Sequence, residues 1–462
     1  MRGHREDWIA AGLLLVSLSC AGSETERPNI VLIIADDQAF TDFGFMGDQI
    51  VRTPHIDRLA AESARFTHAY VPTAMCRPSL ATLLTGRYPH ESGIYFNLAP
   101  GNQQAAVERA FRSLDTLPDL LARKGYSSLQ TGKFWEGHHE NGGFTHGMTI
   151  GETTALADHE TLHAFVGPFG DHGLKIGREG LQPIFEFIEE RGNEPFFVWF
   201  APLIPHVPFT PPDEFAAVYD DLGLDPRIAA YYAMCSWLDA KVGELLDYLD
   251  RKDLAKRTLV VFLSDNGFRP NLQSNQPFHS RRSKASPFEL GVRTPILVRW
   301  PGHTRAATHV EPVSSVDLVP TFLEAAGLGE LPLDLPGISL LASAEGRGGV
   351  QREAVFGEDY RYPATGVGDP AADLLHRWVR RGPWKLIEPT APDSPPMLFR
   401  VAEDPLEQND LAADTEWAPE RAELEALLDA WWQPVAVRSP SADSAGRSAT
   451  REPGTFAGAR GP

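Results

Sequence analysis

The sequence predicts an α/β fold: a large, mostly parallel central sheet with helices on both faces, followed by a smaller C-terminal α+β subdomain with an antiparallel sheet. Three continuous apolar runs, at residues 30–35, 195–200 and 258–264, are typical of buried parallel strands. Helical patterns separate these runs, and strands that alternate with helices form parallel sheets covered on both sides.

Length and charge limit the classes of function. A chain of 462 residues with 42% hydrophobic content can bury a large core, as two domains or as one large domain with an appendage. The formal net charge of -20 argues against a nucleic-acid partner, because binding phosphates requires a basic surface. An anionic substrate would therefore need a locally positive pocket.

The larger α/β domain is expected at residues 27–330. Between its apolar runs lie shorter strands and segments with the three-to-four-residue period of amphipathic helices. The stretch 137–180 is rich in glycine and histidine without such a period, and we expect functional loops over the sheet there. The other predicted strands lie at 66–71, 126–130 and 294–299, and the predicted helices at 54–64, 78–85, 114–124, 183–190, 228–249 and 316–326.

The C-terminal subdomain is expected at residues 331–433. Alternating apolar and polar residues with turn signals predict a small antiparallel sheet, on which a helix packs. Residues 434–462 are mostly Ser, Ala, Gly, Arg and Pro with little to bury, so we expect a disordered tail. The parts of the subdomain are a Pro- and Leu-rich linker at 330–341, strands at 377–387 and 397–401, and a helix at 416–432.

Residues 1–21 have the pattern of an export signal. Two arginines precede an apolar run from Trp8 to Leu18, which is too short to span a bilayer, and small residues follow. Cleavage after Ala21 and acylation of Cys20 are both open, and an ordinary buried helix is the third alternative. Export would take the protein to the periplasm or the outer surface, with membrane contact only through a lipid anchor on Cys20.

Two of the apolar strands end in dyads of oxygen-bearing side chains, Asp36-Asp37 and Asp265-Asn266. If these strands are neighbours in a parallel sheet, the four side chains converge at its carboxyl edge, where such sheets place their sites. Carboxylate and amide oxygens suit Ca²⁺ or Mg²⁺ better than Zn²⁺, and a cation would offset the repulsion between the carboxylates. Capping of the next helix explains either dyad alone equally well.

Cys76 stands where a helix is expected to begin, with Pro78 suited to the first helical position and Gly86 to the stop. The positive end of a helix dipole lowers the pKa of a thiol and attracts anions, so Cys76 is a candidate nucleophile. The alternative is a buried structural cysteine before a core helix. Cys235 follows a helical pattern and is expected to face the core, which makes it a poor disulfide partner.

Three more side chains are expected around the cation. Lys133 follows the strand at 126–130, His206 lies between prolines beside the end of the strand at 195–200, and Lys284 lies in a polar loop. We expect the lysines to clamp an anion and His206 to donate a proton. Singly, the lysines are as well explained as surface charges and the histidine as a turn residue. Together these residues describe hydrolysis of an anionic ester at a metal site.

The stretch Cys76-Arg77-Pro78-Ser79, followed by Leu84-Thr85-Gly86-Arg87, resembles the signature of the type I, formylglycine-dependent sulfatases of the alkaline-phosphatase-like superfamily. The resemblance runs from Pro28 into the C-terminal subdomain, and many blocks in the same order make it specific. The other matching blocks lie at 35–37, 131–133, 205–208, 264–267 and 291–295.

This resemblance implies that a formylglycine-generating maturation enzyme, or an equivalent one, oxidises Cys76 to formylglycine (3-oxoalanine). In the family mechanism one hydroxyl of the hydrated aldehyde attacks sulfur, the leaving alcohol takes a proton, and the second hydroxyl expels sulfate. An unmodified thiol does not complete that last step. The implied Ca²⁺ ligands are Asp36, Asp37, Asp265 and Asn266, and the implied sulfate contacts are Lys133, His206 and Lys284.

The chain departs from the family pattern at two positions. Leu80 stands where the family has an arginine that positions the formylglycine and belongs to the recognition motif of the maturation enzyme. Trp135 stands where the family usually has the histidine of Gly-Lys-x-His. His138 or His139 is a candidate to replace that histidine in substrate binding, and the alternative is that both are polar loop residues.

The sequence therefore predicts an exported sulfatase that hydrolyses a sulfate monoester, expected to be carried by a carbohydrate. A phosphodiesterase or phosphonate monoester hydrolase is the alternative among enzymes, because the related superfamily uses the same metal and nucleophile geometry. A catalytically silent binder of sulfated glycans is the alternative from another class, motivated by Leu80 and Trp135.

Overall fold

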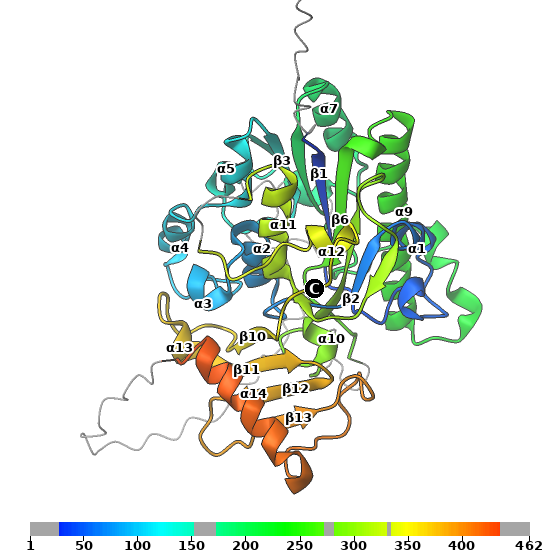
Figure 1. The fold of residues 1–462 in the computed structure, drawn as a ribbon. Helices are drawn as coiled ribbons and strands as arrows, with labels where there is room; N and C mark the ends of the chain where they lie inside the picture. Colours follow the sequence, from blue (N-terminus) through cyan, green and yellow to red (C-terminus); the bar gives the residue numbers. More distant parts are fainter. Residues whose placement is uncertain (1–26, 152–171, 272–280, 330–333, 435–462) are drawn as a thin grey trace, which may run out of the picture.

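The computed structural model describes residues 27–151, 172–271, 281–329 and 334–434. The expected leader with Cys20, the middle of the expected loop stretch and the expected tail beyond residue 434 lie outside these ranges. Figure 1 shows a large unit built around a central sheet and a smaller unit next to it that ends in helix α14 (Ala418–Trp431). Within the described ranges, no helix combines the length and the apolar character that a bilayer span requires.

The strands of the large unit are β1 (Asn29–Ala35), β2 (Ala64–Tyr70), β3 (Ser127–Gly132), β4 (His146–Gly147), β5 (Phe196–Ala201), β6 (Thr258–Ser264), β7 (Arg293–Arg299), β8 (Ala307–His309) and β9 (Val313–Ser314). They form a nine-stranded sheet in the order β4-β3-β5-β1-β6-β7-β2-β8, with β9 also pairing with β2. Among the described strands, neighbours run parallel except where β7 meets β6 and β2. The predicted mostly parallel central sheet is confirmed.

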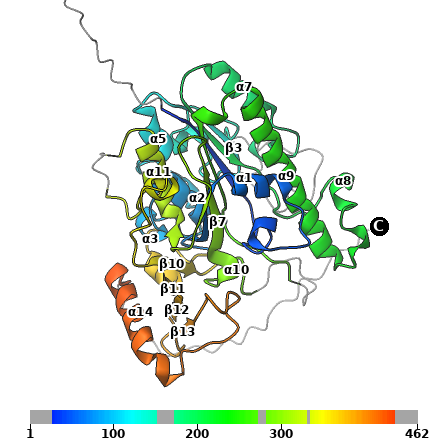
Figure 2. The same ribbon diagram turned by 45° about the vertical axis from the view of Figure 1, so that its right-hand side comes forward.

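The helices of the large unit are α1 (Pro54–Ala61), α2 (Cys76–Thr85), α3 (Pro89–Ser92), α4 (Gln104–Phe111), α5 (Leu117–Ala122), α7 (Gln182–Arg191), α8 (Asp213–Ala216), α9 (Pro226–Arg251), α10 (Glu289–Val292), α11 (Leu318–Ala325) and α12 (Leu341–Ala344). Strand β1 divides the core in two: Ile30 and Leu32 face one apolar cluster, and Val31 and Ile33 face the other. In Figure 2, α2, α5 and α11 lie on one side of the sheet and α1, α7 and α9 on the other.

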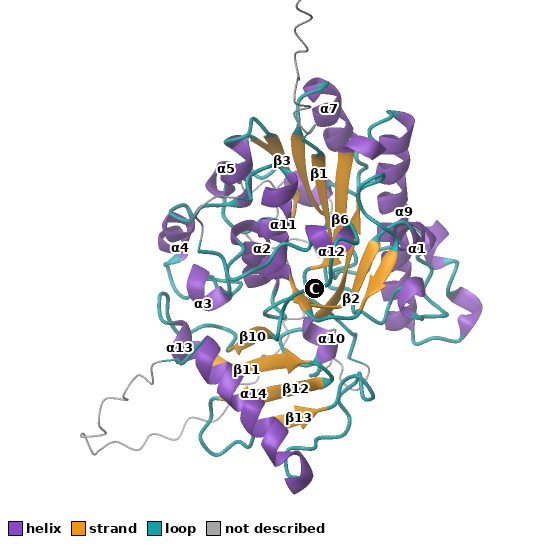
Figure 3. Ribbon diagram, viewed as in Figure 1, coloured by secondary structure: helices purple, strands orange, loops and turns teal. Residues whose placement is uncertain are grey.

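The small unit is an antiparallel sheet in the order β10-β11-β12-β13, with helix α14 across it in Figure 3. One face of this sheet packs against Leu424 and Leu428 of α14, and the other packs against Tyr70 and Val71 of the large unit. The predicted antiparallel C-terminal sheet is confirmed. Its elements are β10 (Val355–Tyr360), α13 (Pro370–Asp373), β11 (Leu374–Arg381), β12 (Trp384–Pro389) and β13 (Met397–Phe399).

The structure differs from the sequence predictions in several segments, among them α4 and β10, which lie where no helix or strand was predicted. The predicted linker at 330–341 ends in α12, and its Leu341 is buried in the apolar cluster that contains α11. Helix α2 begins at Cys76, so Pro78 is its third residue instead of its first. Proline is tolerated there because the first N–H groups of a helix have no partner within the helix. Gly86 ends α2 with a left-handed φ of 68°, as predicted.

We expect Gly132→Ala to lower the free energy of unfolding by more than about 3 kcal/mol, because a side chain there would overlap the neighbouring strand. Gly132 has a φ of 77°, and a Cβ atom would lie 1.9 Å from the carbonyl oxygen of Ala201. Gly125→Ala is the matched control: Gly125 has a φ of 76°, but nothing lies within 4 Å of its added Cβ. Urea denaturation followed by circular dichroism measures both losses, and equal losses would contradict the predicted overlap.

Candidate active site

The two dyads meet at the carboxyl edge of the central sheet. Strands β1 and β6 are parallel neighbours in a register that pairs Ala35 with Ser264, so the residues after each strand lie side by side. The backbone N–H of Asp37 donates to Asp265 Oδ1 at 3.0 Å, and Asn266 Nδ2 donates to Asp37 Oδ1 at 2.7 Å. Asp37 has a left-handed φ of 68°, a costly conformation that this network holds in place.

The dyads offer acceptor atoms that the protein itself does not satisfy. Asp265 Oδ2 and Asn266 Oδ1 are buried without a hydrogen-bond partner among the described residues. Burial, followed by the charge of Asp36, raises the pKa of Asp265 to about 8, so the charged form of this carboxyl group is disfavoured in the protein alone. Three carboxylates and an amide oxygen are the donors that a hard divalent cation prefers. The residues present therefore fit a cation such as Ca²⁺ or Mg²⁺.

The two lysines reach these carboxylates from different elements. Lys133, which follows β3, places Nζ 2.6 and 2.8 Å from the two carboxylate oxygens of Asp36. Lys284, from the loop before α10, places Nζ 2.6 Å from both carboxylate oxygens of Asp37. Burial alone would lower both lysine pKa values, but the carboxylates outweigh it and raise them. Both lysines are therefore charged and stand where an anion could be held.

Cys76 lies beside Lys284 and the first dyad. Its Sγ is 3.1 Å from Lys284 Nζ and 4.0 Å from Asp37 Oδ1. The prediction that its helical position lowers the pKa of the thiol is wrong: burial raises that pKa to about 12, despite Lys133 and Lys284. Desolvation of the buried thiolate outweighs the favourable charges of both ammonium groups. Without modification, Cys76 is a protonated thiol at neutral pH.

His206 stands on the same side of the cluster. Its Nε2 is 3.5 Å from Asp37 Oδ2, and its Nδ1 is 2.6 Å from the carbonyl oxygen of Val207. Because a carbonyl only accepts, Nδ1 carries the proton, and Nε2 faces the site. Burial lowers the pKa of His206 to about 4, so the ring is neutral at pH 7.

His138 and His139 are not brought into this cluster. Among the described residues they form a separate group with Glu140, in which their rings stack at 4.4 Å. His138 Nδ1 accepts from the backbone N–H of Glu140 at 3.3 Å, and His139 Nδ1 lies 3.1 Å from the carbonyl oxygen of Thr149. Their role in binding substrate remains a prediction.

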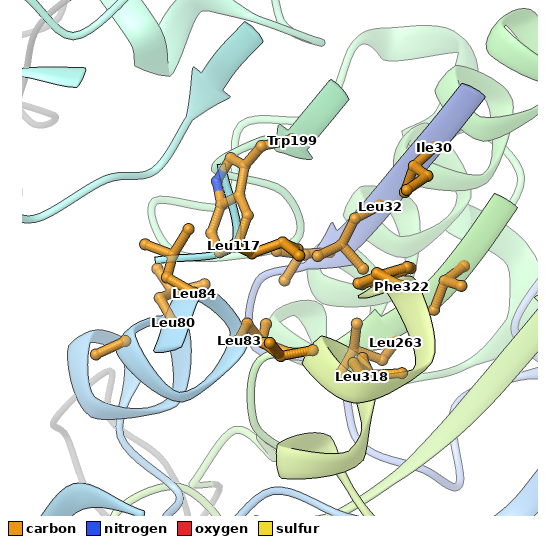
Figure 4. Packing of buried hydrophobic residues seen from close by; sticks show 14 of the residues in the cluster. Ile30, Leu32, Leu80, Leu83, Leu84, Leu117, Trp199, Leu263, Leu318 and Phe322 are labelled. Carbon is orange, nitrogen blue, oxygen red and sulfur yellow. The ribbon is translucent and has the colours of Figure 1, made fainter. Parts of the chain in front are cut away.

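Leu80 and Trp135 occupy their positions as apolar residues. Leu80 is 4% exposed and lies near Leu84 in the apolar cluster of Figure 4. Trp135 packs against the same cluster, with its ring centroid 5.9 Å from Lys133 Nζ. Both departures from the family pattern are therefore accommodated as contacts of the core.

The sequence did not reveal a buried ion pair next to Cys76. Arg77 Nε and Nη2 donate to the two carboxylate oxygens of Glu136 at 2.9 and 2.7 Å, and both side chains are almost fully buried. Arg77 follows Cys76, and Glu136 lies three residues beyond Lys133. The position of each residue near a predicted site residue was the only hint in the sequence. No local pattern predicts an ion pair between residues 59 positions apart. The pair ties the start of α2 to the segment that carries Lys133.

The mostly parallel sheet carries at its carboxyl edge a buried cysteine and acidic groups that could hold a metal ion, which is where α/β enzymes place their active sites. Residues 28–328 match the family model described as Sulfatase, and residues 279–433 match the one described as N-sulphoglucosamine sulphohydrolase, C-terminal. The chain belongs to the sulfatase family and is a sulfuric ester hydrolase.

Curated relatives cover nearly the whole chain. Arylsulfatase A of Bos taurus is 30% identical over 486 residues, covering 90% of this chain and 90% of that protein. N-acetylglucosamine-6-O-sulfatase of Bacteroides thetaiotaomicron is 25% identical over 518 residues, covering 89% of this chain and 88% of that protein. The phosphonate monoester hydrolase of Agrobacterium radiobacter shares the fold, with a TM-score of 0.67, 21% identity and coverage of 88% and 96%.

We expect Leu80→Arg, which restores the family's arginine, to lower the free energy of unfolding by about 3 kcal/mol or more. The reason is that Leu80 is 4% exposed in an apolar cluster, so an arginine there would carry its charge into apolar surroundings. Leu80→Met keeps the volume and the apolar character of the side chain, so it should lower the free energy of unfolding by less than about 1.5 kcal/mol. Chemical denaturation measures both variants, and wild-type stability of Leu80→Arg would contradict this placement of the side chain.

We expect Ca²⁺ or Mg²⁺ to raise the stability of the protein, because either ion would neutralise the crowded carboxylates. A concentration one hundred times the dissociation constant should add about 2.7 kcal/mol, and a chelator should reverse the gain. Thermal unfolding with each ion and with chelator measures the effect. Asp265→Ala should abolish the response, whereas the exposed Asp115→Ala should retain it. An unchanged response in Asp265→Ala would exclude the cluster as the binding site.

Proposed function

We propose that this protein hydrolyses a sulfate monoester carried by a carbohydrate, using a formylglycine formed from Cys76 and a Ca²⁺ ion held by the two dyads. The observation that carries the proposal is the convergence of Cys76, Lys284 and Asp37, with Sγ 3.1 Å from the ammonium group. The name of the N-acetylglucosamine-6-O-sulfatase relative supports a sulfated sugar as the substrate.

The groups of this chain would divide the reaction between them. Lys133 and Lys284 would hold sulfate oxygens and stabilise the charge that develops as the ester bond breaks. His206 points Nε2 into the site, and the negative charge of a bound sulfate ester would favour protonation of that nitrogen, which would then give its proton to the oxygen of the leaving alcohol. Since a carbonyl fixes its other nitrogen, the ring has one orientation for that transfer.

The proposed reaction also needs a bound cation and a modified residue 76. A Ca²⁺ ion on Asp36, Asp37, Asp265 and Asn266 would supply positive charge next to the reacting sulfate. Formylglycine at position 76 would supply a hydrated aldehyde, whose two hydroxyl groups allow both attack on sulfur and release of sulfate. The high pKa of the buried Cys76 thiol supports a nucleophile of this modified kind, because a protonated thiol attacks poorly.

We also propose that the protein is exported through the leader at residues 1–21 and meets its maturation enzyme on the way. The support is the order of charged, apolar and small residues in that segment. Cys20 would carry a lipid anchor if the leader is of the lipoprotein type, and cleavage after Ala21 would release the chain without one.

The test is a paired assay on protein produced with a formylglycine-generating enzyme. We expect conversion of Cys76 in its peptide by mass spectrometry, and faster turnover of a sulfate ester than of the matching phosphate monoester, phosphodiester and phosphonate ester. Cys76→Ala should lose turnover, whereas Cys235→Ala, which removes a core-facing thiol, should keep it.

Other outcomes select other functions. Preference for a phosphate or phosphonate ester would assign the site to the phosphodiesterase and phosphonate hydrolase branch of the superfamily. An unconverted Cys76 with retained binding of a sulfated glycan and no turnover would make the protein a silent binder, and either result would overturn the proposal.

A further inference from the structure

A fully buried charge cluster joins the two units of the molecule. Lys385 of β12 places Nζ 3.1 Å from Glu289 Oε1 and 3.0 Å from Glu407 Oε1, and none of the three side chains is more than 1% exposed. Glu289 belongs to α10 in the large unit, while Lys385 and Glu407 belong to the small unit. Charges this deep are costly unless paired, so their geometry is strongly constrained.

Further polar groups complete the cluster. Glu289 Oε2 accepts from the hydroxyl group of Tyr70 at 3.1 Å and lies 3.6 Å from Arg293 Nη1. Arg380 Nε donates to the same tyrosine oxygen at 3.1 Å. Burial would raise the pKa of Glu289, but Lys385 and then Arg293 outweigh it and lower that pKa. Glu289 is therefore held as a carboxylate, which fixes the position of α10.

The loop that carries Lys284 is attached to this cluster at both ends. Before the lysine, Arg282 Nη1 donates to the carbonyl oxygen of Glu407. After it, the backbone N–H of Glu289 donates to Glu407 Oε2 at 2.6 Å. One residue of the small unit thus anchors the chain two residues before and five residues after Lys284.

The loop needs such anchoring because its backbone is strained. Ala285, directly after Lys284, has a left-handed φ of 54°, which an alanine adopts only when its surroundings enforce it. The backbone N–H of Ala285 donates to the carbonyl oxygen of Ala74, two residues before Cys76, at 2.9 Å. The strained turn therefore sets the position of Lys284 relative to Cys76.

We propose that Lys385 and Glu407 of the C-terminal subdomain are positioning residues for Lys284: they lock its loop so that the ammonium group stands beside residue 76 and the sulfate. This inference rests on the proposed function of Lys284 as a sulfate contact. The small unit would then be needed to place Lys284, although neither Lys385 nor Glu407 touches the reacting atoms.

A purely structural role makes a different prediction, so a double-mutant cycle on the metal-loaded, formylglycine-containing enzyme tests the proposal. We expect Lys385→Met to lower kcat/KM for a sulfate ester by about tenfold per folded molecule, and to weaken inhibition by inorganic sulfate by a similar factor. In the Lys284→Ala background the same change should cost less than about twofold, because the residue that it positions is absent. Lys385→Arg should recover most of the loss.

The control is Arg377→Met, which removes another buried cation of the small sheet from its more exposed carboxylate partners. Arg377 pairs with Glu388 and Asp429, away from the Lys284 loop. We expect it to lower the melting temperature while leaving kcat/KM per folded molecule unchanged. If Lys385→Met does not fold, Glu407→Ala replaces it, because it removes the acceptor of the Glu289 N–H and leaves Lys385 paired with Glu289.

Equal losses from Lys385→Met in the wild-type and Lys284→Ala backgrounds would overturn the positioning role and leave the proposed function intact. A Lys284→Ala variant with wild-type kcat/KM would remove the role of Lys284 itself, and this inference with it. A failure of the proposed function as a whole is recognised separately, by the absence of sulfate ester turnover in the unmutated enzyme.

Discussion

Three carboxylates must lie close together at one end of a buried sheet, and the rest of the site follows from how their charge is balanced. The parallel register of β1 and β6 forces Asp36, Asp37 and Asp265 together, out of contact with water. Like charges in such a place need cations within a few ångströms. Lys133 and Lys284 supply two, and the unsatisfied oxygens of the second dyad are ligand atoms suited to a divalent ion.

The cations reach the carboxylates because separate parts of the fold deliver them. Lys133 directly follows Gly132, the last residue of β3. Because Gly132 has no side chain, the backbone at this point can lie close to β5. Lys284 arrives on a strained loop between the two units, beside an apolar interface that includes Ala74 and Trp378. The positions of Lys133 and Lys284 relative to Cys76 are thus fixed by packing in two units.

Helix α2 shows why the signature segment tolerates a leucine. All ten of its residues are buried, so each face meets a different environment. Leu80 and Leu84 face the apolar cluster, Arg77 faces Glu136, and Ser79 Oγ donates to the carbonyl oxygen of Asp265 at 2.5 Å. A helix buried on every side has no single apolar stripe, and its polar contacts depend on what the fold brings to each face.

The sequence by itself determined the sheet, the two dyads and the residues that gather around Cys76, because continuous apolar runs, strand ends and ordered motifs are local features. Only the tertiary structure decided the raised pKa of the Cys76 thiol, the burial of α12 and the partners of Arg77 and Lys385. Desolvation depends on everything packed around a group, and buried charges pair across tens to hundreds of residues. Neither desolvation nor the pairing of distant charges follows a period or a spacing in the sequence. Both can therefore be known only from the folded structure.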